Sequence, residues 1–239
     1  MNIVAIIQAR MGSSRLPGKM MMDLCGYPVL HWVLHRVKRA SSLQGIMLAT
    51  TILPQDDVLV ELARGLRVKV FRGDAADVLG RFDGAAAQAQ ADVVVRVCAD
   101  NPFIAPEEID RLTEAYAAQL QAHGDPTRLY LFNHITTREN RYPDGLGAEI
   151  FSRQLLRDLA ARAVDPDHRE HVTTYVWDHP EAFQMYALPP PPEIAYPGVK
   201  LDVDNQSDLD RLRILGAQVS LDSSALDTIR AYLAHFEQP

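Results

Sequence analysis

Short apolar runs alternate with amphipathic stretches through the first half of this 239-residue chain. The runs are rich in β-branched residues, which is typical of strands buried on both faces, and they cover Ile3–Ala9, Gly45–Thr51, Val68–Phe71 and Asp92–Ala99. Apolar residues recur at helical spacing between and after them, over Pro28–Arg39, Asp56–Leu66, Asp77–Gln90 and Pro106–Leu120. Strands and helices thus alternate along the chain. Because a helix that connects two parallel strands makes a right-handed crossover, we predict an α/β fold with a mostly parallel, doubly wound sheet.

The second half of the chain is less regular. Its expected strands are Leu129–Asn133, Gly147–Phe151, Phe183–Leu188 and Val199–Asp204. Its expected helices are Ser152–Val164, Arg169–His179, Gln206–Leu215 and Leu226–Phe236, and Pro189–Pro192 is expected to be a stiff spacer. We predict one domain over residues 1–239, with a lid or dimerisation arm at about residues 129–190.

Composition and charge exclude several classes of protein. An apolar fraction of 47% excludes intrinsic disorder. A formal charge of −7, from 24 Lys and Arg against 31 Asp and Glu, argues against binding to nucleic acid or to an anionic membrane. Two cysteines, Cys25 and Cys98, make neither a disulfide framework nor a structural zinc site, which fits the cytoplasm. We expect no signal peptide and no membrane span, because no apolar run approaches ~18 residues.

The segment that follows the first expected strand is rich in cations and small residues. It runs from Gln8 to Lys19 and carries Arg10, Arg15 and Lys19 together with Gly12, Ser13, Ser14 and Gly18. Open α/β sheets bind ligands at the carboxyl ends of their strands. Glycines let backbone N–H groups approach an anion, and guanidinium and ammonium groups neutralise it. This loop therefore predicts a polyphosphate site.

Counting residues excludes two common phosphate loops. Five residues separate Gly12 from Gly18, where a Walker loop has four, and Met20 follows Lys19 in place of a metal-holding hydroxyl. The Gly-x-Gly-x-x-Gly fingerprint of dinucleotide-binding folds is also absent from the loop.

Carboxylates that could hold a metal follow two other expected strands. Asp100 stands at the carboxyl end of Asp92–Ala99, the sheet edge from which the cationic loop also emerges. Asp202 and Asp204 are two residues apart in an expected strand and so share one face. Two close carboxylates are costly unless a cation neutralises them, and Mg²⁺ is commonly held by one or two carboxylates plus phosphate oxygens. Asp208 is expected to open the next helix instead.

The run Ile7–Lys19 resembles the opening motif of the cytidylyltransferases that activate acidic sugars as CMP derivatives. The nearest likeness is the spore coat polysaccharide biosynthesis protein F branch of that family. The likeness continues in the family's order through most of the chain, in Pro28–Leu30, Ala49–Thr51, Phe71–Gly73, Asp77–Leu79, Arg96–Pro102, Tyr142–Phe151, Arg169–Thr173 and Val203–Leu209.

The resemblance implies a nucleotide-diphospho-sugar transferase-like fold and assigns residues to three groups. The nucleotide would contact Gln8, Ala9, Arg10, Gly12, Ser13, Ser14, Arg15, Lys19, Thr50, Arg72, Asp77 and Asp100. The acceptor would contact Tyr142, Asp144, Glu149, Arg169 and His171, and Mg²⁺ would be held by Asp100 and Asp204 with Asp202 beside them. Gly147 stands where relatives more often carry Asp, which leaves the acceptor open. Relatives are commonly dimers, so a homodimer is expected.

The hypothesis is nucleotidyl transfer from CTP, in which positioning and charge neutralisation supply most of the catalysis. Arg15 and Lys19 would hold the leaving phosphates, Arg10 would lie near the α-phosphate or the base, and Asp100 would complete the catalytic set. A glycosyltransferase that uses Asp202 and Asp204 for its metal and a non-catalytic nucleotide-binding module are the alternatives. His31 and His35 have a zinc-like spacing, but without a third ligand we expect solvated helix surface there.

Overall fold

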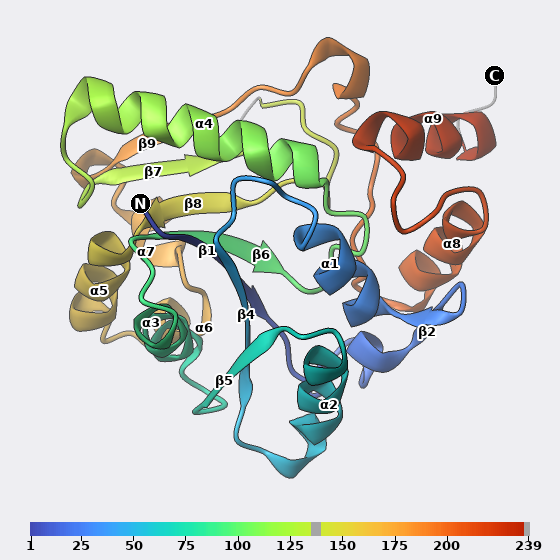
Figure 1. Cartoon of the computed structure of the whole chain (residues 1–239), viewed down its shortest axis with the longest axis horizontal. Helices are drawn as coiled ribbons and strands as arrows, with labels where there is room; N and C mark the ends of the chain where they lie inside the picture. Colours follow the sequence, from blue (N-terminus) through green and yellow to red (C-terminus); the bar gives the residue numbers. More distant parts are fainter. Residues whose placement is uncertain (135–139, 237–239) are drawn as a thin grey trace.

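The computed structural model describes residues 1–134 and 140–236, and these form a seven-stranded sheet in the order β5-β4-β1-β6-β8-β7-β9 (Figure 1). The strands are β1 (Ile3–Gln8), β4 (Gly45–Thr51), β5 (Lys69–Gly73), β6 (Val93–Cys98), β7 (Leu129–Phe132), β8 (Glu149–Ser152) and β9 (Gln184–Ala187). All of them run in one direction except β8, which is antiparallel to both of its neighbours. A small hairpin of β2 (Asp23–Leu24) and β3 (Tyr27–Pro28) lies outside the sheet.

The helices cover both faces of the sheet, which confirms the predicted α/β class. The α-helices are α1 (Val29–Val37), α2 (Asp57–Gly65), α3 (Val78–Gln88), α4 (Pro106–His123), α5 (Arg153–Arg162), α6 (Pro166–Glu170), α7 (Thr174–Asp178), α8 (Gln206–Gly216) and α9 (Ala225–Phe236). Single 3-10 turns occur at η1 (Lys19–Met21), η2 (Pro54–Asp56), η4 (Pro180–Ala182) and η5 (Pro192–Ile194). Most predicted elements therefore end within a few residues of the observed ones.

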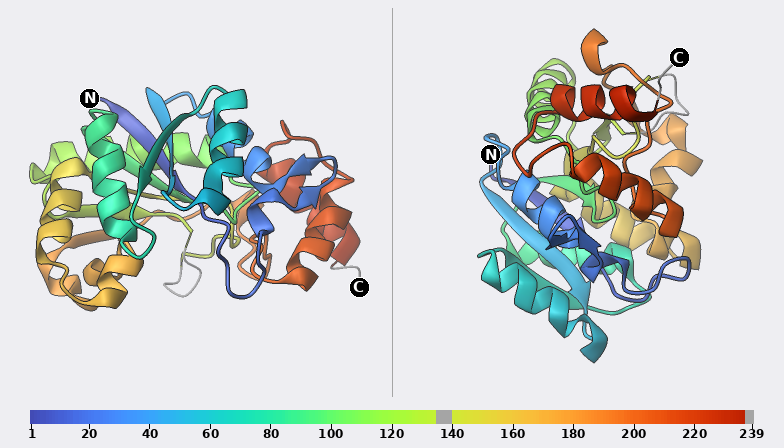
Figure 2. Two further views of the ribbon diagram at one scale, coloured as in Figure 1. Left: turned by 90° about the horizontal axis from the view of Figure 1, so that it is seen from below. Right: turned by 90° about the vertical axis from the view of Figure 1, so that its right-hand side faces the viewer.

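Three apolar clusters hold the layers together. One face of the sheet buries its side chains against α1, α2 and α4, and the other face buries them against α3, α5 and α7. A third cluster joins α8 and α9 to α1 and to the segment around Leu201. Figures 1 and 2 show α8 and α9 at the opposite end of the molecule from α5. Burial of these apolar surfaces supplies the main stabilisation of the fold.

Two predicted elements are wrong. The expected strand Val199–Asp204 pairs with the rest of the chain by a single bridge between Asp144 and Lys200, so it is an extended segment outside the sheet. The expected helix Arg169–His179 is split into α6 and α7, because His171 is extended, with φ −114° and ψ 98°. The break turns Val172 into the apolar layer under the sheet, where its side chain is buried.

The register of the central strands fixes where functional loops can lie. Gln8, the last residue of β1, pairs with Cys98, the last residue of β6. The loops that leave these two strands therefore begin at the same edge of the sheet. This edge carries both the cationic loop and Asp100, as the sequence predicted.

Candidate functional site

The cationic loop after β1 folds back on itself. The backbone N–H groups of Ser13 and Gly18 both donate to the carbonyl of Met11, at 3.0 Å each. Gly18 has φ +75°, a left-handed conformation that favours glycine. The Met11 N–H donates in turn to Asp56 Oδ1 at 2.7 Å, which ties the loop to the end of β4. These contacts hold the backbone of the loop in the shape of a rim.

The rim encloses a cavity of about 510 Å³ at the carboxyl edge of β1 and β6. Four cationic side chains and two carboxylates line the cavity, so its wall is positive in a protein whose net charge is −7. The lining residues are Gln8, Ala9, Arg10, Gly12, Ser13, Ser14, Arg15, Lys19, Met20, Val78, Arg81, Cys98, Ala99, Asp100, Glu170 and His171. A positive, polar cavity of this kind concentrates anionic ligands.

Lys19 and Asp100 form an ion pair in the wall of this cavity. Lys19 Nζ lies 3.0 Å from Asp100 Oδ2 and also donates to the carbonyl of Val203 at 2.7 Å. The Val203 N–H donates to the Asp100 carbonyl at 2.8 Å, so the loop after β6 and the segment before α8 are bound together. The ammonium group is nearly buried, with 11% of the side chain exposed. Its position is therefore fixed before any ligand arrives.

The second pair of carboxylates lies beside this contact. Arg15 reaches Asp204 Oδ1 at 2.9 Å, and Lys200 Nζ lies 3.0 Å from Asp202 and 3.6 Å from Asp204. Burial, followed by the nearby charges of Asp204 and Asp100, raises the pKa of Asp202 against the opposing effect of Lys200. The acidic pair is thus held together by cations from its own segment and from the loop.

Asp144 joins the same acidic group. Burial and the neighbouring Asp202 raise its pKa to about 6, although Lys200 and His134 act in the opposite direction. Its backbone accepts a hydrogen bond from the Leu201 N–H at 2.9 Å. The predicted acceptor residue Asp144 therefore stands next to the predicted metal residues, where a cation would relieve the crowding of negative charge.

These carboxylates fit a magnesium ion that arrives with phosphate groups. Carboxylate oxygens are the ligands that Mg²⁺ prefers, and it commonly keeps several waters or phosphate oxygens in its coordination shell. Within residues 1–134 and 140–236, no three His, Cys, Asp or Glu side chains converge to form a complete metal site. The described residues thus offer one or two carboxylates to a metal at this position, and the rest of its coordination shell would come from water or from oxygens of a ligand.

Several residues assigned by resemblance do not line the cavity. Thr50 is fully buried within β4. Arg72 donates to the carbonyls of Thr51 and Leu53 and pairs with Asp57 at 2.6 Å. The predicted nucleotide contacts of Thr50 and Arg72 would therefore require rearrangement of the local structure.

Asp77 and Arg169 are occupied with each other. Asp77 is the N-cap of α3, where its Oδ1 accepts from the Gly80 N–H at 2.8 Å, and its Oδ2 pairs with Arg169. Arg169 also donates to the carbonyl of Ala160 at 2.8 Å. The ion pair joins α6 to α3 beside the cavity. Neither residue lines the cavity, but both help to position the helices that do.

Two predicted acceptor residues are enclosed by the fold. The Tyr142 hydroxyl is buried against Glu108 and Arg111. Glu149 lies in the sheet, where its carboxylate pairs with Arg96 and, at 2.8 Å, with His134. Of the predicted acceptor residues only His171 lines the cavity.

Three charged residues at this site were not predicted from the sequence. Arg81 lines the cavity from α3 and donates to the carbonyl of Ala75 at 3.0 Å. Glu170 lines the cavity from α6 and pairs with Arg10 at 3.0 Å. Lys200 bridges three carboxylates and could have been found from the alternation of Lys200, Asp202 and Asp204 on one face of an extended segment. Arg81 and Glu170 carry no such pattern, because only folding brings them to the loop.

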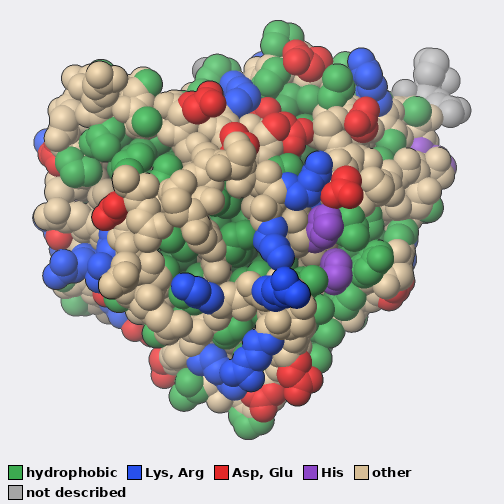
Figure 3. Space-filling view, viewed as in Figure 1, with side chains coloured by type: hydrophobic (Ala, Val, Ile, Leu, Met, Phe, Trp, Pro, Cys, Tyr) green, Lys and Arg blue, Asp and Glu red, His purple; other side chains and the backbone are tan. Residues whose placement is uncertain are grey.

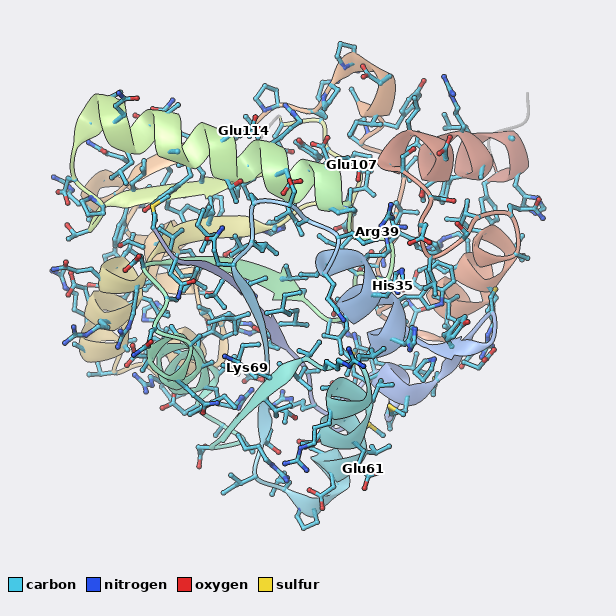
Figure 4. The ribbon with its side chains drawn as sticks, in the orientation of Figure 1. His35, Arg39, Glu61, Lys69, Glu107 and Glu114 are labelled. Atoms are coloured by element: carbon cyan, nitrogen blue, oxygen red, sulfur yellow. The ribbon has the colours of Figure 1, made fainter. Side chains whose placement is uncertain are left out.

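The zinc-like histidine spacing has a structural explanation. His35 Nε2 lies 2.9 Å from Asp222 Oδ1, and Arg39 pairs with the same carboxylate at 3.3 Å. Figure 4 shows His35 on α1 and Arg39 just beyond the end of that helix. His31 stacks on Tyr27 instead. This supports the expectation that the two histidines belong to the helix surface.

A second cavity, of about 410 Å³, lies at the opposite edge of the sheet. It is lined by Lys38, Arg67 and Lys69 among others, and Figure 3 shows lysine and arginine side chains gathered in the middle of this face. Lys38 donates to the carbonyl of Leu66 at 2.8 Å, just after the end of α2. Cations at this edge therefore complement the negative carboxyl ends of the helices.

The fold and the cavity define a nucleotidyltransferase of the nucleotide-diphospho-sugar transferase type. A cytidylyltransferase from Leptospira borgpetersenii serovar Hardjo-bovis superimposes with a TM-score of 0.86 and 30% identity, and the match covers 96% of this chain and 93% of the other. A CMP:2-keto-3-deoxy-manno-octonic acid synthetase, solved with CTP, shares the fold at a TM-score of 0.66 and 17% identity, over 91% of this chain and 99% of the other.

The chain belongs to the cytidylyltransferase family, whose model matches residues 4–229. It is 31% identical to the spore coat polysaccharide biosynthesis protein SpsF of Bacillus subtilis, over 95% of this chain and 93% of that protein. It is 30% identical to the 3-deoxy-manno-octulosonate cytidylyltransferase of an Anaeromyxobacter species, over 79% and 78% of the two chains. No helix in residues 1–134 and 140–236 is long and apolar enough to cross a membrane.

Proposed function

We propose that this protein transfers CMP from CTP to the hydroxyl of an acidic sugar or a related acceptor and releases pyrophosphate. The acceptor oxygen forms a bond to the α-phosphorus, the bond from that phosphorus to the bridging oxygen of pyrophosphate breaks, and the hydroxyl proton passes to solvent. Membership of the cytidylyltransferase family supports the nucleotide and the reaction. The SpsF and octulosonate relatives support an acidic sugar that is used for a surface polysaccharide or glycoconjugate.

The observation that carries the proposal is the contact between the cationic loop and two distant carboxylates. Lys19 meets Asp100 and Arg15 meets Asp204, although each pair is far apart in the sequence. A triphosphate in this cavity would exchange these carboxylates for its own oxygens, so that the cations neutralise the leaving pyrophosphate. Arg10 and Arg81 extend the positive wall beyond Lys19.

Magnesium is part of the proposal. Asp100 and Asp204, with Asp202 beside them, would hold Mg²⁺ together with phosphate oxygens. When bound, the ion would supply charge neutralisation at the phosphates and lower the pKa of the acceptor hydroxyl. Lys19 and Arg15 lie next to these carboxylates, which supports a role for the protein's own cations at the same phosphates.

Pyrophosphate release measures the proposed reaction directly. The purified protein is incubated with Mg²⁺, each of the four nucleoside triphosphates and a panel of 2-keto-3-deoxy sugar acids, and products are identified by mass spectrometry. We expect release with CTP and with one class of acceptor, together with a CMP-linked product. A glycosyltransferase would release no pyrophosphate, so the absence of release with every pair would reject the proposal. Sedimentation of the same sample tests the expected homodimer.

A further inference from the structure

A short helix next to the cavity is held there by ion pairs and hydrogen bonds and by ring contacts of His168 with Tyr175 and His179. Helix α6 has five residues, Pro166–Glu170, and none of them is buried. The chain on either side of it is anchored, because Ala163 before it and Val172 after it are both buried in the apolar layer. A segment that is anchored at its ends and buries no side chain between them can move without disturbing the core.

Two ion pairs fasten α6 to the nucleotide side of the cavity. Arg169 pairs with Asp77 at the start of α3, and Glu170 Oε1 accepts from Arg10 at 3.0 Å. Both members of the second pair line the cavity and are well exposed, at 40% for Arg10 and 51% for Glu170. An exposed ion pair of this kind contributes little stability and is easily exchanged.

The cation that Glu170 neutralises lies in a pair of guanidinium groups. Arg10 and Arg81 both donate to the carbonyl of Ala75, at 3.2 Å and 3.0 Å. Arg81 Nε is buried and has no hydrogen-bond partner in the described part of the chain. Glu170 is the carboxylate that pairs directly with Arg10, whereas Asp77, Asp56 and Asp74 act on Arg81 through their charges without forming an ion pair with it in the described part of the chain. A phosphate group, with more charge and more acceptor oxygens than a carboxylate, fits the two guanidiniums better.

We propose that the Glu170 carboxylate is an internal stand-in for a substrate phosphate. It holds Arg10 in place in the free protein and is displaced when the triphosphate binds, which frees the Glu170 end of α6 from the cavity wall while Arg169 keeps its contact with Asp77. His171, next in the chain, lines the same cavity, so the displacement also moves a predicted acceptor contact. Glu170 is a positioning residue that enforces the order of binding, with the nucleotide before the acceptor. The inference rests on the proposed function for the identity of the nucleotide.

Replacement of Glu170 tests the inference. If the carboxylate competes with phosphate for Arg10, its removal should strengthen phosphate binding. If it only supports the structure of the site, its removal should leave binding unchanged or weaken it. Glu170→Gln is compared with Glu181→Gln, an exposed carboxylate in η4 outside the cavity. Binding of CTP and of inorganic tripolyphosphate is measured by calorimetry. We expect Glu170→Gln to bind both about two- to five-fold more tightly than the wild type, the range that loss of one exposed competing ion pair allows. Glu181→Gln should match the wild type.

A second arm removes the cation. In an Arg10→Gln background, Glu170→Gln should have no further effect on tripolyphosphate affinity, because the carboxylate no longer competes for a guanidinium. Unchanged or weaker binding by Glu170→Gln in the wild-type background would overturn the inference, as would failure of the wild type to bind tripolyphosphate.

Hydrogen exchange on the unmodified protein gives a reading that needs no variant. We expect amides of residues 165–171 to exchange faster after tripolyphosphate or CTP is added, whereas the loop at residues 9–19 becomes protected. Protection of both segments would overturn the displacement. If the affinity and exchange results hold but no acceptor yields pyrophosphate, the inference stands and the proposed function fails. If pyrophosphate is released but Glu170→Gln binds CTP and tripolyphosphate no more tightly than the wild type, the proposed function stands and the inference fails.

Discussion

At the scale of single residues, Asp100 is the side chain on which the proposed reaction depends most. Its carboxylate contacts Lys19 at 3.0 Å, its backbone binds Val203, and it lines the cavity. We expect Asp100→Asn to lower the rate of CTP-dependent pyrophosphate release by at least ~10²-fold, because the amide keeps the shape but loses the charge that a metal and Lys19 require. The measurement is the steady-state rate at saturating CTP and Mg²⁺.

Asp210→Asn is the matched control for this change. Asp210 is an exposed aspartate of α8 that pairs with Arg213 at 3.0 Å, away from the cavity. Its variant should keep wild-type activity, and the thermal unfolding of both variants should stay close to that of the wild type. Full activity of Asp100→Asn would remove this residue from the proposed mechanism.

At the scale of elements, one buried ion pair joins the parallel and antiparallel parts of the sheet. Arg96 on β6 faces Glu149 on β8 in register, and His134 after β7 contacts the same carboxylate. These cations hold the pKa of Glu149 at about 2, below its ordinary value of 4.5, although burial alone would raise it. The pair thus contributes stability above pH 4.5 that is lost as the pH falls from about 4.5 to about 2.

Glu149→Gln should therefore destabilise the protein strongly at neutral pH. Removal of one partner leaves the buried Arg96 without a counter-charge, for which we expect a loss of about 3–5 kcal/mol in the free energy of unfolding. The loss should shrink toward pH 2, where the wild type also loses the pair. The double variant Arg96→Met/Glu149→Leu should recover much of the stability at pH 7. Equal unfolding free energies for Glu149→Gln and the wild type at pH 7 would contradict this account.

Gly147 lies where the chain just before β8 packs closely against the chain just after β7. A Cβ atom at this position would lie 2.0 Å from the carbonyl oxygen of Asn133, closer than any real contact. We expect Gly147→Ala to lower the free energy of unfolding by about 2 kcal/mol or more, because the backbone of β7 or β8 must shift. Gly65→Ala, where a Cβ meets nothing within 4 Å, should change it by less than about 1 kcal/mol. The free energies of unfolding of the two variants are measured by denaturant titration. Equal values for the two variants would show that the backbone at β8 can shift without cost.

The elements also show how far the sequence alone could predict this structure. The parallel strands and long helices were predicted within a few residues, because hydrophobic periodicity reports burial directly. The segment at 199–204 has the same alternation but finds no second strand to pair with, and periodicity cannot report a missing partner. The contact of Asp100 with the loop followed from the sheet edge, whereas the contact of Asp204 did not, because its segment lies outside the sheet. Contacts such as that between Asp77 and Arg169, 92 residues apart, depend on tertiary packing and were not foreseen.

At the scale of the whole molecule, a negative protein surrounds a positive cavity. The net charge is −7, yet four cations and two carboxylates line the site. A triphosphate is repelled by the molecule at a distance and attracted at the cavity, and both effects are screened by salt with a Debye length of about 10 Å at 0.1 M. Inside the partly enclosed cavity the triphosphate lies closer to the cations than to most of the negative charge of the protein. The attraction should therefore exceed the repulsion there.

The ionic-strength dependence of CTP binding separates these two effects. If attraction at the cavity dominates, the KM for CTP should rise about three- to ten-fold as NaCl increases from about 50 mM to about 500 mM, whereas kcat changes little. Arg15→Gln removes a cation whose side chain is 68% exposed at the rim, so it should raise the KM at low salt and flatten its dependence on salt. Arg230→Gln, which replaces an exposed cation of α9 that does not line the cavity, should leave the slope unchanged. A KM that falls with added salt would mean that repulsion by the net charge governs binding, and that the loop cations are already neutralised by the carboxylates they contact.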